Sequence, residues 1–231
     1  MKNKLGNFVA ATIMAGYLGF TCHVFSNIFF HGKSFSTVAI EDIKLVESVE
    51  FSQEERDQYS KIIPSKKQKH TTLSWQEAIT EINDPLEVQD YLFWHLNYKD
   101  EHVSTTFSKM HEDREADCMG YSLSAAALLS DNNYPPYILA TVSTEGMAHA
   151  VFLYKTKEGF GALGNSPLSP QYETIDDLLK TLYTIYPFGG EVERYAIIDL
   201  DKTFPNKEWI EGDIITELRR VDKIYKPKIK D

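Results

Sequence analysis

Apolar residues follow a helical pattern in several parts of the chain. Residues 121–129 are rich in Ala and Leu, which is typical of a helix with a buried face. Turn-forming residues at 130–133, just before Pro135, predict where this helix ends. Residues 85–96 predict another helix with one apolar stripe, and residues 174–183 predict an N-capped amphipathic helix.

Other segments have the composition of strands. Residues 137–142 and 148–154 are rich in β-branched and aromatic side chains and are bounded by turn-forming residues. Residues 160–164 follow the turn at 155–159, so the second and third of these strands are expected to form a hairpin. Residues 194–200 predict one more strand. Helices and strands that mix in this way predict an α+β fold with an antiparallel sheet.

The chemistry of this pattern centres on Cys118, which begins the helical segment and is followed along the chain by His149 and Asn165. At the first turn of a helix, unsatisfied N–H groups and the helix dipole favour a thiolate and lower the thiol pKa. An imidazole can accept the thiol proton if a third polar group holds the ring in place. Pairing of the predicted hairpin brings the start of one strand, with His149, toward the end of the next, with Asn165.

Three motifs carry a resemblance to a known family: Ala116-Asp117-Cys118 with its Ala-rich helix, His149-Ala150-Val151, and Gly164-Asn165. Over residues 73–200 the chain resembles the transglutaminase-like superfamily, a branch of the papain-like cysteine enzymes. The resemblance implies Cys118 as nucleophile, His149 as general base and Asn165 as the orienting residue. Asp is commoner than Asn at the third position of this superfamily, and Asn would orient the imidazole without adding a full charge.

Each of these residues also has an ordinary structural interpretation. A cysteine in an Ala-rich helix is often a small buried hydrophobe, and a histidine among apolar strand residues is often part of a core. Gly164-Asn165-Ser166-Pro167 is also common turn sequence. On the 85–96 helix, Trp94 and His95 are assigned to packing rather than to ligand binding.

Composition limits the classes of partner. The chain has 231 residues, which is enough for one well-filled core. Its formal net charge of −10 disfavours nucleic acid as a partner, because phosphate binding needs a concentrated positive surface. Neither His-x-x-x-His nor Cys-x-x-Cys spacing occurs, so no metal site is expected. Phosphate-loop and dinucleotide signatures are also missing from the sequence, so no cofactor is expected.

The N-terminus carries an apolar segment, residues 8–30, preceded by Lys2 and Lys4 and long enough to cross a bilayer. We interpret residues 1–30 as a signal peptide or membrane anchor, residues 31–72 as a polar tether and residues 73–231 as the transglutaminase-like domain. Export is therefore expected, with the chain anchored in a membrane or released. Because Cys22 lies within the apolar segment, Cys118 would then have no disulfide partner in the chain.

Together these features predict an exported cysteine hydrolase or acyltransferase that acts on amide bonds through a Cys118 thioester. Its substrate would be a peptide or protein amide, including cell-wall peptide if the source is bacterial. One alternative is a catalytically inactive, membrane-tethered binding or scaffold module of the same fold. Another is an NlpC-type cell-wall peptidase, which shares the Cys-then-His order but differs in its third residue.

Overall fold

The computed structural model describes residues 36–45, 72–99, 107–130, 132–186 and 189–204. The predicted α+β class is confirmed, with helices packed on a five-stranded sheet in the order β6-β5-β4-β3-β7, every neighbouring pair antiparallel. The strands are β3 (Tyr137–Ser143), β4 (Ala148–Thr156), β5 (Gly159–Leu163), β6 (Leu168–Tyr172) and β7 (Val192–Asp199). Two short parallel strands, β1 (Asn97–Tyr98) and β2 (Glu115–Ala116), pair apart from this sheet.

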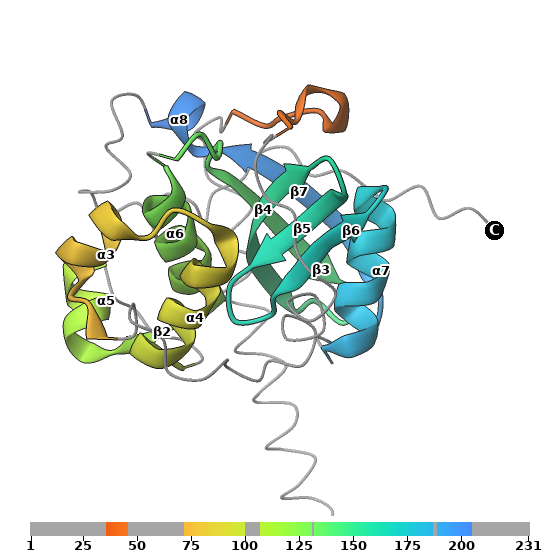
Figure 1. Ribbon diagram of the computed structural model, residues 1–231. Coiled ribbons are helices and arrows are strands. Elements are labelled where there is room, and N and C mark those ends of the chain that lie inside the picture. The colour runs from red at the N-terminus through yellow and green to blue at the C-terminus, as the bar shows by residue number, and fades with distance from the viewer. Residues whose placement is uncertain (1–35, 46–71, 100–106, 131, 187–188, 205–231) are drawn as a thin grey trace, which may run out of the picture.

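The helices cover both faces of the sheet, as Figure 1 shows. One face carries α3 (Trp75–Glu81), α4 (Pro85–His95), α5 (Phe107–Asp113) and α6 (Cys118–Leu129), and the other carries α7 (Ile175–Ile185). A short helix, α8 (Leu200–Thr203), follows β7, and Ile40–Asp42 form one 3₁₀ turn, η1. Two hydrophobic cores result, one on each side of the sheet, and α6 contributes to the first.

Local capping explains where the helices begin. Ser74 and Glu77 form a capping box before α3, and the Asp84 carboxylate accepts from the N–H groups of Leu86 and Glu87 before α4. Thr174 caps α7 by accepting from the N–H of Asp177. The predicted 148–154/160–164 hairpin is confirmed, since β4 and β5 pair from Phe152↔Leu163 to Thr156↔Gly159.

The N-terminal edge of the described structure extends the sheet. Thr37 bridges Ile198 of β7, the Val38 N–H donates to the Ile197 carbonyl at 2.9 Å, and Val38 and Ile43 are buried in the α7-side core. Residues 36–45, which fall within the predicted tether, therefore pack on the sheet. The predicted apolar segment at 8–30 lies outside the described residues, and no helix within those residues is long and apolar enough to span a membrane.

Close packing around Gly120 in α6 predicts a steric penalty for a larger side chain. A Cβ at this position would lie 2.6 Å from Met110 Sδ and 2.9 Å from Ala116 Cβ. We expect Gly120→Ala to lower the free energy of unfolding by about 1–3 kcal/mol, measured by urea denaturation, although Ala favours helices by about 1 kcal/mol. A more stable Gly120→Ala variant would show that helix propensity outweighs the clash.

Candidate active site

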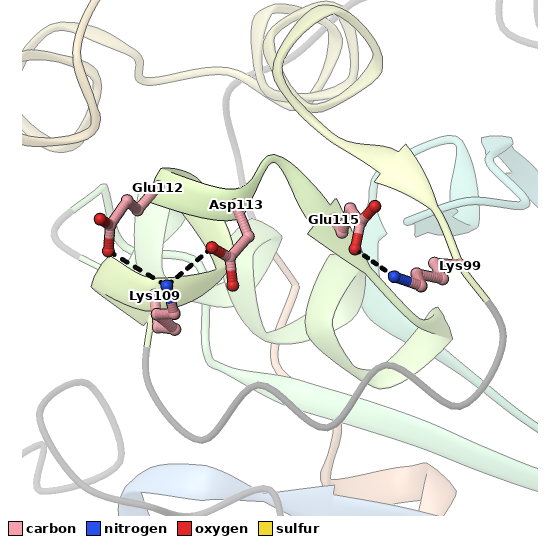
Figure 2. Close-up of polar contacts among 5 residues, drawn as sticks. All are labelled: Lys99, Lys109, Glu112, Asp113 and Glu115. Atoms are coloured by element: carbon pink, nitrogen blue, oxygen red, sulfur yellow. Dashed lines mark hydrogen bonds and ion pairs between the residues drawn. The ribbon is translucent and has the colours of Figure 1, made fainter.

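The two short strands β1 and β2 position the backbone that leads into Cys118. β2 ends at Ala116, and its pairing with β1 fixes this position two residues before the cysteine. Lys99 and Glu115 form an ion pair of 2.6 Å across the pair, and Lys109 binds Glu112 and Asp113 on α5 (Figure 2). These charges are exposed, so each pair contributes at most about 1 kcal/mol. Position 116 is held mainly by burial of Ala116 in the α6-side core.

Cys118 is the first residue of α6, which agrees with its predicted place in the first turn of this helix. Its side chain is half-buried against the α6-side core, and it forms no disulfide with a described residue. Asp117 caps the helix by accepting from the Gly120 N–H at 2.8 Å. The helix N-terminus favours a thiolate, while the neighbouring Asp117 carboxylate opposes it.

This opposition predicts the effect of Asp117→Asn. Asn caps helices about as well as Asp but carries no charge, so the fold is retained and the thiolate loses a repulsive neighbour. We expect the Cys118 pKa to fall by up to about one unit, which corresponds to about 1.4 kcal/mol of lost repulsion between two partly solvated charges. The pH dependence of alkylation measures this change. A rise in the thiol pKa would indicate that the carboxylate holds a nearby positive group instead.

His149 is the second residue of β4 and lies on the face of the sheet opposite α6. Side chains alternate along an uninterrupted strand, so His149 shares a face with Val151 and Leu153, which pack in the α7-side core. The imidazole is 4% exposed. Burial lowers the pKa of His149 to about 3, so the ring is neutral at physiological pH.

Tyr183 of α7 lies beside the strand pair that carries His149. Its hydroxyl lies 2.7 Å from Thr141 Oγ1, and Thr141 pairs with His149 across β3 and β4 and donates to the His149 carbonyl at 3.3 Å. Burial raises the pKa of Tyr183 to about 12, the Thr141 hydrogen bond lowers it, and negative charge on Cys118 raises it.

Asn165 lies in the loop just after β5. The preceding residue, Gly164, is held by Gln89 of α4, whose amide donates to the Gly164 carbonyl at 2.8 Å and accepts from its N–H at 3.1 Å. Asn165 Oδ1 is buried and accepts no hydrogen bond from a described residue. The expected orienting bond from His149 to Asn165 is therefore not formed in this conformation.

The three predicted residues are placed by different parts of the fold, and Cys118 and His149 belong to opposite sides of the sheet. Cys118 approaches from the α6 side, His149 faces α7, and Asn165 follows the strand next to β4. Sequence reasoning missed Gln89, Thr141 and Tyr183, which hold the surrounding backbone. The local sequence gives no such signal for Gln89, because its burial becomes evident only in the structure, where buried amides need partners.

Two other histidines, His95 and His111, are half-buried beside the α6-side core. His111 stacks on Trp75 with ring centroids 3.8 Å apart, and His95 stacks on Tyr91 at 3.9 Å. Burial, followed by the nearby His95, lowers the pKa of His111 to about 3. Among the described residues, no three His, Cys, Asp or Glu side chains are grouped in a way that would hold a metal ion.

Comparison with known proteins adds no family assignment. No family model matches the chain, and no curated protein matches it.

Proposed function

We propose that the chain is a cysteine hydrolase or acyltransferase that acts on amide bonds through a thioester at Cys118, on a transglutaminase-like, papain-related fold. The observation that carries the proposal is the position of Cys118: a half-buried thiol at the first residue of α6, where the helix N-terminus favours a thiolate. The apolar segment at 8–30 supports the further proposal of an exported, membrane-anchored or released protein.

The proposed reaction has two steps with balanced proton transfers. Cys118 Sγ attacks the amide carbonyl carbon as its proton passes to His149, and that proton then leaves with the amine as the C–N bond breaks. Water or a second amine next attacks the thioester and gives its proton to His149, which returns it to the departing thiolate. The low pKa of His149 keeps the imidazole neutral in the resting state and makes it a weak base in this conformation.

The alternative is an inactive binding or scaffold module of the same fold. Two observations favour it: the burial of His149, and the Asn165 Oδ1 atom that accepts no hydrogen bond from a described residue. An NlpC-type peptidase also stays an alternative, because its third residue would be a group other than Asn165.

Alkylation of Cys118 by iodoacetamide from pH 5 to 9.5 distinguishes these proposals. Mass spectrometry of the peptide that contains Cys118 separates its reaction from that of Cys22. We expect the reaction to follow a pKa below the ordinary value near 8.5, and His149→Ala to slow it at pH 7 by about tenfold or more. Val151→Ala, a buried truncation on the same face of β4, is the matched control and is expected to leave the rate unchanged.

Asn165→Ala is expected to change the rate less than His149→Ala, since Asn165 Oδ1 accepts no bond from a described residue. A thiol with ordinary reactivity that neither substitution changes would exclude the enzyme and favour the scaffold.

A further inference from the structure

Ser36, the first described residue, is fixed at the end of the sheet where β7 ends and α8 begins. Its N–H donates to Thr203 Oγ1 at 3.1 Å, and its carbonyl accepts from the Asp199 N–H at 3.0 Å. The bridge between Thr37 and Ile198 is antiparallel, so the backbone at Ser36 runs, in the N-terminal direction, toward this end of the sheet. We call it the α8 end (Figure 1).

The candidate site lies at the opposite end of the sheet. Asp199 pairs with Tyr137 at the start of β3, whereas His149 pairs with Thr141, four residues further along that strand. Because a strand rises about 3.3 Å per residue, His149 lies about 13 Å from the α8 end. Strand β2, which leads into Cys118, also lies away from α8, at the bottom of Figure 1.

The link between Ser36 and the apolar segment at 8–30 is short. Only five residues, 31–35, separate the two. An extended chain spans at most about 3.6 Å per residue, so Ser36 lies within about 20 Å of the end of that segment. A small domain is about 30 Å across, which is more than this link can reach. A bilayer that holds residues 8–30 therefore lies on the side of the domain where Ser36 is fixed.

We infer that residues 8–30 stay in a bilayer and that the five-residue link holds the α8 end of the domain toward the lipid headgroups. This inference rests on the membrane-anchored form of the proposed function and adds the orientation of the domain. The exposed side chains of Lys157, Asp201 and Lys202 at this end are charged, so they suit the hydrated headgroup region and not the hydrocarbon. Cys118 then faces the aqueous compartment, and a substrate reaches it from that side.

The test measures the heights of two exposed turns above the membrane. The full chain, with Cys22→Ser and Cys118→Ser, is placed in phosphatidylcholine vesicles and labelled at one new cysteine: Lys157→Cys after β4 or Glu145→Cys before β4. Energy transfer from the dye to labelled lipid headgroups gives its height. Because β4 joins the two turns and rises about 3.3 Å per residue, we expect the dye at 145 to lie about 25 Å higher than the dye at 157.

A longer link is the matched control. We expect an insertion of about twenty Gly and Ser residues after Lys33 to let the domain rotate and to reduce the height difference toward zero, since such a chain is a flexible coil. A difference that the insertion leaves unchanged would overturn the role of the link. Mass spectrometry of the chain from membranes of expressing cells should find residues 1–30 intact, and their loss would overturn the inference.

These measurements do not use the reactivity of Cys118. Equal heights of the two dyes in the chain with its natural link would overturn the orientation alone. Ordinary reactivity of Cys118 toward iodoacetamide would overturn the proposed enzyme and would leave the orientation supported by the height difference.

Discussion

Lowering the pH from 7 to 4 is expected to reduce the free energy of unfolding by several kcal/mol, with His149 and His111 as main contributors. Burial lowers the pKa of each to about 3, whereas a histidine in the unfolded chain titrates near 6.5. Between these values the folded protein keeps both rings neutral while the unfolded chain binds two protons. The stabilisation is therefore complete above pH 6.5 and is lost as the pH falls toward 3.

The size of this effect follows from linkage. Each histidine contributes a slope of about 1.4 kcal/mol per pH unit, which gives roughly 3 kcal/mol for each ring between pH 6.5 and 4. Losses of this size are a large part of the stability of an ordinary domain. Urea denaturation at a series of pH values measures the slope.

A matched variant separates the histidines from the carboxylates that also titrate in acid. His111→Phe keeps an aromatic ring against Trp75 but binds no proton at this position. The slope of its unfolding free energy against pH should therefore be smaller than that of the unaltered protein by the value for one proton, about 1.4 kcal/mol per pH unit. Identical slopes in the two proteins would contradict a neutral, buried His111.

Replacing Gln89 by Met is expected to lower the free energy of unfolding by about 2–5 kcal/mol. The Gln89 amide makes two hydrogen bonds to the backbone of Gly164, and both residues are buried. Methionine has a similar length but leaves the Gly164 N–H and C=O without these partners, and an unsatisfied buried group costs about 1–3 kcal/mol. Gln76→Met on the exposed face of α3 is the matched control and is expected to change stability by less than about 0.5 kcal/mol.

Gln89→Glu adds a test of the mechanism. A protonated glutamic acid can both donate to the Gly164 carbonyl and accept from its N–H, whereas an ionised carboxylate has no proton to donate. We expect this variant to be less destabilised relative to the unaltered protein at pH 4 than at pH 7. The same penalty at both pH values would show that the two hydrogen bonds are not the source of the stability.

Local chemistry predicted many of the elements. The start of α6 at Cys118 and its end at Leu129 follow from the Asp117 cap and the turn-forming residues at 130–133. β6 was missed because the segment Leu168–Tyr172 contains a proline and has no run of β-branched residues. The short strands β1 and β2 were also missed, since two residues carry no periodicity.

The geometry of the candidate site was harder to predict. Because helices cover both faces of the sheet, residues 149–154 are buried without a polar face, and the pattern does not indicate which side His149 points to. The contacts of Gln89 with Gly164 and of Tyr183 with Thr141 join residues 75 and 42 positions apart, and no local pattern reports such pairs.

The segment at residues 36–45 covers the outer edge of β7. Backbone hydrogen bonds to Ile197 and Asp199 and the buried side chains of Val38 and Ile43 attach it to the sheet. A chain trimmed to begin at residue 72 would leave the outer backbone N–H and C=O groups of β7 unpaired, and such an edge favours self-association. We expect a synthetic peptide with the sequence of residues 36–45 to bind the exposed β7 edge of the trimmed protein and to reduce its self-association.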